Sequence, residues 1–126
     1  SKKKIIDMEI KKTGMLFSFC CMAPLIVKNK NLKLMKTFEN IGLYIGLLFQ
    51  IADDLIDYTG KTNKAGKKTK KDHKKGKATL ISLLGDKNAV KYCHEIKSKI
   101  IKKVKKCGFK YFYLDETLDY IINRNK

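Results

Sequence analysis

The sequence contains little of what builds β-sheets, disulfide scaffolds or structural zinc sites. Its 126 residues include one proline, eight glycines and no tryptophan, whereas antiparallel β-sandwiches need frequent turn signals. Its four cysteines, Cys20, Cys21, Cys93 and Cys107, form no CxxC pair, which argues against a zinc framework and gives no recognisable disulfide pattern. We therefore expect helices, with reduced thiols in a cytoplasmic protein.

Arginine is nearly absent, although the chain is strongly basic. The formal net charge is +17, from 29 basic and 12 acidic residues, and Arg124 is the only arginine. Lysine supplies diffuse positive potential but lacks the planar fork that reads guanine or clamps phosphate. The main interpretation thus includes no nucleic acid among the partners, and a non-catalytic basic helical protein that binds polyanions remains as the alternative.

Apolar runs are short. The longest, over residues 41–52, is interrupted by Gln50 and followed at once by Asp53 and Asp54, so it is too short to span a membrane. We expect no stable membrane insertion. With 44% hydrophobic residues, the chain can still bury a core.

Apolar periodicity and turn signals divide the chain into helices. The central segment is apolar on almost all sides, and Gly42 and Gly46 on it allow a neighbouring helix to approach closely. The predicted elements are a helix over 5–24 that is broken near 13–14 and kinked or stopped by Pro24, a connection over 27–33, a central helix over 34–58 ended by Gly60, a lysine-rich loop over 61–77, a short helix over 78–84, and helices over 87–106 and 114–122.

A polar stripe marks the end of the central helix. Gln50, Asp53, Asp54 and Asp57 are spaced i, i+3, i+4 and i+7, so they share one helix face. Carboxylates this close repel one another unless cations are present, and Mg²⁺ accepts oxygen ligands of this kind, usually together with a phosphate-bearing substrate. The pattern alone leaves a second interpretation open, in which the aspartates form a solvated helix end paired with lysines.

Several motifs occur in one order along nearly the whole chain. They are Lys12-Thr13-Gly14, Gly46, Phe49-Gln50, the DDxxD motif of Asp53, Asp54 and Asp57, Gly66-Lys67, Asp72, Gly76-Lys77-Ala78-Thr79, and the terminal Tyr120-Ile-Ile-Asn-Arg-Asn-Lys. This set resembles the C-terminal portion of the trans-isoprenyl diphosphate synthases, or polyprenyl synthetases, and most of all bacterial farnesyl diphosphate synthases. The FQxxDDxxDY run with the motifs after it is far more specific than a lone DDxxD.

The resemblance implies an all-α fold, in which these would be the C-terminal helices of the isoprenoid synthase helical bundle around a central cavity. We expect residues 1–126 to be the C-terminal portion of one polyprenyl synthetase domain. The family's first aspartate-rich motif and its isopentenyl diphosphate site would precede it. A fragment of this kind would be inactive alone, and the full-length enzyme would be a homodimer.

The resemblance also implies a reaction and site residues. The enzyme would be a Mg²⁺-dependent prenyltransferase that condenses isopentenyl diphosphate with an allylic diphosphate, dimethylallyl or geranyl, to give farnesyl diphosphate; a geranylgeranyl product is the alternative. Asp53 would be the principal Mg²⁺ ligand, assisted by Asp54 and Asp57. Lys12, Thr13, Gln50 and Lys67 would hold the allylic diphosphate, with Asp53, Lys12 and Lys67 as the catalytic set. Product length is set mainly before the first aspartate-rich motif, so these residues do not determine it.

Overall fold

The computed structural model describes residues 1–64 and 79–124, and every element in this part is a helix. In chain order these are α1 (Lys2–Glu9), the π-helical turn η1 (Ile10–Gly14), α2 (Met15–Val27), α3 (Leu32–Lys64), α4 (Leu80–Leu84), α5 (Asp86–Lys106) and α6 (Phe112–Asn123). The all-α expectation is confirmed.

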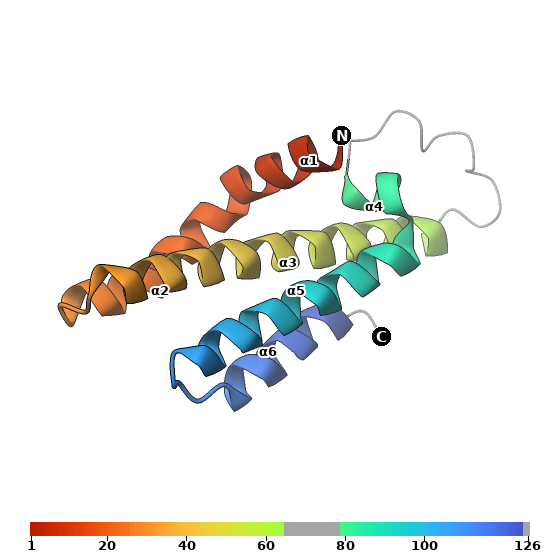
Figure 1. The fold of residues 1–126 in the computed structure, drawn as a ribbon. Coiled ribbons are helices and arrows are strands. Elements are labelled where there is room, and N and C mark those ends of the chain that lie inside the picture. Colours follow the sequence, from red (N-terminus) through yellow and green to blue (C-terminus); the bar gives the residue numbers. More distant parts are fainter. Residues whose placement is uncertain (65–78, 125–126) are drawn as a thin grey trace.

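The long helix α3 is the centre of the arrangement. The run α1, η1 and α2 lies along one side of it, and α5 with α6 lies along the other (Figure 1). The short α4 contacts α1, α3 and α5. The predicted central helix is thus confirmed as the element on which the others pack.

One hydrophobic core joins these layers. Its fully buried side chains include Leu48 and Ile51 of α3, Cys93 and Ile100 of α5, and Leu118 of α6. The apolar side chains that recur with helical spacing along α5 are buried, apart from Val90, which is half-buried. This core fixes α6 against α3 and so sets where the end of α6 lies.

The chain between α2 and α3 turns through local hydrogen bonds. Asn29 adopts a left-handed conformation with φ of 48°, and the Lys30 amide donates to the Leu25 carbonyl at 2.9 Å, a Schellman ending. The Asn31 side chain then accepts from the Leu34 amide at 2.9 Å and caps α3. The asparagine-rich connection was predicted, but it is shorter than 27–33 because both helices extend into it.

Two predicted boundaries are wrong, and at Pro24 one of the two predicted alternatives, a helix stop, is excluded. Pro24 does not stop its helix, because it lies within the last turns of α2, which continues to Val27. Gly60 does not end the central helix, because α3 continues to Lys64; a helical glycine costs only about 1 kcal/mol relative to alanine, which is not enough to break a helix. The short helix begins at Leu80 rather than 78, because Thr79 and Ser82 form a capping box.

The helical run Lys2–Val27 has a property that the sequence analysis did not consider. Its 26 residues are long and apolar enough to cross a membrane by length and composition, and 17% of the most apolar window is buried within the chain. Core helices of soluble proteins pass the same test. The expectation of no membrane insertion stays a prediction.

Candidate functional site

The close approach of η1 to α3 positions the first part of the site. A Cβ atom built on Gly46 would lie 2.5 Å from the Gly14 Cα, and one built on Gly42 would lie 2.4 Å from the Ser18 Cα. No side chain fits at either position, so α3 touches η1 at Gly46 and α2 at Gly42 backbone to backbone. The predicted role of Gly42 and Gly46 is therefore confirmed.

This approach brings Thr13 to Gln50, which follows Gly46 by one helical turn. The Thr13 hydroxyl donates to Gln50 Oε1 at 2.9 Å, and Gln50 Nε2 donates to Asp54 Oδ1 at 3.4 Å. The Gln50 side chain is buried, with 5% of its surface exposed. A relay of hydrogen bonds thus connects the η1 segment to the aspartates.

The turn that carries Lys12 and Thr13 is π-helical. Such turns place one extra residue in a helix and occur often at functional sites. The buried positions show the extra residue directly, since the spacing is four from Ile5 to Glu9, five from Glu9 to Gly14, and four from Gly14 to Ser18. The predicted break near 13–14 is therefore an inserted residue in a continuous helix.

The three aspartates share one side of α3 but differ in environment. The Asp53 side chain is 53% exposed, Asp57 is also exposed, and Asp54 is half-buried. Desolvation raises the pKa of Asp54 above its usual value, and the charges of Asp53 and Asp57 add to this effect. The hydrogen bond from Gln50 and the charge of Lys12 act in the opposite direction on that pKa. The ionised form of Asp54 is thus disfavoured, mainly by burial and to a smaller extent by the two neighbouring carboxylates.

Lys12 faces this negative charge without an ion pair. Its ammonium group influences the Asp54 carboxylate electrostatically, and no ion pair of Lys12 occurs among the residues that the structure describes. Lys12 also borders a shallow hollow of about 500 Å³ that Lys4, Asp7, Met8 and Lys11 line. Its charge is therefore available to an anion placed beside the aspartates.

The aspartates suit a magnesium ion that is shared with a phosphate. Within residues 1–64 and 79–124, no three His, Cys, Asp or Glu side chains converge into a preformed metal cage. Mg²⁺ usually binds one or two carboxylates and completes its octahedron with waters and substrate phosphates. The exposed Asp53, and Asp54 whose ionised form is destabilised by burial, fit that mode of binding.

One site residue was missed by the sequence analysis. Arg124, at the end of α6, places its Nη2 3.3 Å from Asp53 Oδ1, across 71 residues of sequence. Its guanidinium carbon also lies 4.8 Å from the centre of the Phe49 ring, a cation–π contact. Two signals were available, because Arg124 is the only arginine among 29 basic residues and lies in the terminal motif Tyr120-Ile-Ile-Asn-Arg-Asn-Lys.

The predicted site is only partly brought together by the described residues. Thr13, Gln50 and Asp54 are linked by hydrogen bonds, while Lys12, Asp53 and Asp57 lie around them without such bonds to this relay. Lys67 lies outside the described residues, as do Gly66, Asp72, Gly76 and Lys77. Its predicted contact with a diphosphate stays a prediction.

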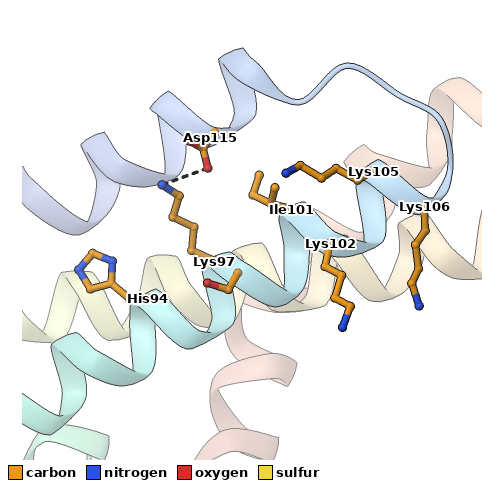
Figure 2. Close-up of a pocket in the computed structure, with 8 residues that line it drawn as sticks. His94, Lys97, Ile101, Lys102, Lys105, Lys106 and Asp115 are labelled. Carbon is orange, nitrogen blue, oxygen red and sulfur yellow. Dashed lines mark ion pairs between the residues drawn. The ribbon is translucent and has the colours of Figure 1, made fainter.

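A second hollow lies on the other side of the molecule, between α5 and α6. It measures about 510 Å³ and is lined by His94, Lys97, Ser98, Ile101, Lys102, Lys105, Lys106 and Asp115. Figure 2 shows Lys97 reaching from α5 to Asp115, while Lys102 and Lys106 extend away from α6.

Lys97 in this hollow is held by α6. Its Nζ lies 2.6 Å from Asp119 and 3.1 Å from Asp115. Desolvation acts to lower the pKa of Lys97, but the hydrogen bonds and charges of these two aspartates raise it overall. Lys97 thus joins α5 to α6 through ion pairs. The outer lysines of this hollow, Lys102, Lys105 and Lys106, are exposed to solvent.

The chain is similar to several known proteins. The family model described as polyprenyl synthetase matches residues 1–112. The chain is 30% identical to a geranylgeranyl pyrophosphate synthase of Geoglobus acetivorans, over 95% of the chain and 40% of that protein. It is also 30% identical to the farnesyl diphosphate synthase of Escherichia coli, over 91% of the chain and 40% of the enzyme.

A solved structure shows the same arrangement. The crystal structure of a geranyltransferase from Helicobacter pylori superposes with a TM-score of 0.67 at 25% identity, covering 98% of this chain and 39% of the other. The chain thus spans about two-fifths of the length of these relatives. Their names include farnesyl, geranylgeranyl and octaprenyl synthases, so similarity at this level does not separate product lengths. Because the family model matches most of its length, the chain belongs to the polyprenyl synthetase family.

Proposed function

We propose that this chain forms the second aspartate-rich half of a trans-prenyltransferase site. The enzyme condenses isopentenyl diphosphate with an allylic diphosphate and gives a short-chain isoprenyl diphosphate, farnesyl diphosphate in the first instance and geranylgeranyl diphosphate as the alternative. The observation that carries the proposal is the relay from Thr13 through Gln50 to Asp54, with Lys12 beside it. It joins an anion-binding segment to a cation-binding one.

The chemistry requires both segments. The carbon–oxygen bond of the allylic diphosphate breaks, the alkene of isopentenyl diphosphate attacks the allylic cation, and a proton is lost to the departing diphosphate. Mg²⁺, held by Asp53 with help from Asp54 and Asp57, would neutralise charge on the leaving diphosphate. Lys12 contributes a second positive charge at the same place, without itself transferring a proton.

The relay fixes the relative positions of the side chains that would surround the diphosphate and its metal ion. Gln50 accepts from Thr13 through its carbonyl oxygen and donates through its amide nitrogen to Asp54. Both ends of the buried amide are thereby engaged, which holds its orientation. Thr13 and Asp54 consequently keep a fixed separation across the two helices, and preorganisation of this kind lowers the reorganisation cost during reaction.

The remaining parts of the proposal concern the whole protein. We propose a homodimer whose other residues supply the isopentenyl diphosphate site and the first metal site. Lys67 is proposed to contact the allylic diphosphate, as an ammonium group on the segment between α3 and α4. Activity therefore requires the protein expressed from its complete gene, since this chain spans about two-fifths of its relatives' length.

The test is incorporation of isopentenyl diphosphate into allylic product by that protein, with and without Mg²⁺. Asp53→Asn should lower kcat/KM at least about 100-fold, since loss of a ligand that stabilises transition-state charge costs several kcal/mol. Asp86→Asn, at the exposed N-terminal turn of α5, is the matched control and should leave the rate unchanged. Mg²⁺-independent activity, or an unchanged rate in Asp53→Asn, would contradict the assignment.

The second candidate function is binding of a polyanion by the outer lysines of the hollow between α5 and α6. The observation that favours it is the group Lys102, Lys105 and Lys106 on one helix face. Binding to an anionic polymer such as heparin should then weaken steeply with salt and ignore both Mg²⁺ and Asp53→Asn. A titration that is insensitive to salt excludes this alternative.

A further inference from the structure

Arg124 joins the far end of the chain to the aspartate stripe. Its Nη2 donates to Asp53 Oδ1 at 3.3 Å, and the core that packs α6 on α3 keeps the two groups in reach. The arginine side chain is 20% exposed and that of Asp53 is 53% exposed. The positive group is therefore the more buried partner of the pair.

The contact uses only part of what a guanidinium offers. A bidentate pair would place two N–H groups on the two carboxylate oxygens, whereas the described residues show one contact, to Oδ1. The buried Nε of Arg124 makes no hydrogen bond within that part of the chain. The Phe49 ring supports the guanidinium from its face. Arg124 is thus held beside Asp53 through a contact to one carboxylate oxygen only, among the described residues.

We infer that Arg124 restrains the Asp53 carboxylate in the cation-free protein and competes with the divalent cation for the same oxygen. This inference rests on the proposed metal role of Asp53. A cation bound to Asp53 is repelled by the guanidinium charge. Arg124 must therefore move away from the carboxylate or share it with the cation. Binding of a cation to the aspartates is in this way linked to the packing of the C-terminal end of α6.

The linkage is reciprocal. If Arg124 weakens binding of the cation, the cation must weaken the contact between Arg124 and Asp53 by the same factor. Binding of a divalent cation should therefore loosen the last turn of α6. A merely structural arginine, which only fastens α6 to α3, would show no such dependence on the cation.

The experiment measures binding of Mn²⁺ alone, without substrate, to the protein from its complete gene, by the spin-resonance signal of free Mn²⁺. Arg124→Gln should bind Mn²⁺ about two- to five-fold more tightly, the range expected for removing a partly exposed competing charge. Arg124→Lys keeps the charge and should stay within about two-fold of wild type. Hydrogen exchange of the last turn of α6 should speed up with Mg²⁺ in the wild-type protein but not in Arg124→Gln.

The outcomes separate this inference from the proposed function. If Asp53→Asn leaves Mn²⁺ binding unchanged, Asp53 is no ligand, and both the metal role and the inference fail. If binding needs Asp53 but Arg124→Gln binds Mn²⁺ equally or less tightly, only the inference is overturned. Unchanged exchange in α6 on adding Mg²⁺ overturns it as well, while a thermal melt of each variant confirms that it is folded.

Discussion

For some single residues the sequence predicts the neighbouring side chains, and for others it does not. The spacing of Gln50, Asp53 and Asp54 placed them on one helix face, and the structure agrees. The partner of Asp53 could not be foreseen, because the contact with Arg124 depends on how α6 packs on α3. Helical spacing predicts which residues share a face, but it does not say which distant side chain will lie opposite that face.

Cys93 offers a prediction at this scale. The thiol is fully buried in α5, and desolvation raises its pKa from 9.0 to about 12. Between pH 9 and about pH 12 the thiol stays protonated in the folded state and ionises in the unfolded state. Its contribution to stability is therefore complete below about pH 9 and is lost as the pH rises toward 12.

The measurement compares wild type with Cys93→Ala in urea at pH 8 and pH 10. At pH 8 the variant has the lower free energy of unfolding because it loses packing. At pH 10 ionisation of Cys93 in the unfolded state destabilises only the wild type, so the difference in free energy of unfolding should shrink by about 1 kcal/mol. Comparing the two proteins cancels the titration of lysines and tyrosines. A deficit that stays constant between the two pH values contradicts a buried, protonated thiol.

At the scale of elements, the contact between η1 and α3 depends on two glycines. A Cβ on Gly46 would lie 2.5 Å from the Gly14 backbone, so Gly46→Ala must push the helices apart. We expect a loss of about 2–4 kcal/mol in the free energy of unfolding, because the clash involves backbone rather than a flexible side chain. The same shift should break the hydrogen bond between Thr13 and Gln50.

Gly60 provides the matched control on the same helix. Nothing lies within 4 Å of a Cβ built there, and alanine is the better helix former. Gly60→Ala should therefore stabilise the protein by up to about 1 kcal/mol in chemical unfolding. If both substitutions change stability equally, the close approach at Gly46 is not what holds these elements together.

Element boundaries were predicted less well than element identities, for a local reason. Periodicity located all the long helices, yet the central helix begins at Leu32 and continues past Gly60. A turn signal shows only a local preference, while the flanking residues and tertiary contacts decide whether the helix continues. The π-helical turn was likewise visible as an irregularity, but its geometry depends on the packing of Gly14 against Gly46.

For the molecule as a whole, the exposed apolar side chains are the main feature. Leu16, Phe19 and Val27 are 60% or more exposed on α2, and the chain spans about two-fifths of the length of its relatives. An isolated chain with such a surface should associate with itself. We expect the 126-residue chain to elute as mixed oligomers in light-scattering chromatography and to bind hydrophobic dyes.

The double variant Leu16→Lys and Phe19→Lys should reduce this association. Its melting temperature should change little, because neither side chain belongs to the core. A monodisperse wild-type monomer with a sharp cooperative melt would show instead that the chain is self-sufficient.

The extra residue of the η1 turn affects how well this helix tolerates a change in length. One residue advances an α-helix by about 100°, so an added residue would normally rotate everything beyond it off the core. Here the bulge absorbs that rotation, and Ile5, Glu9, Gly14 and Ser18 are all buried. Removing Lys11 would restore an even spacing of four and leave the buried stripe in phase. The deletion should change the directions of the Lys12 and Thr13 side chains, so we expect it to harm the site more than the fold.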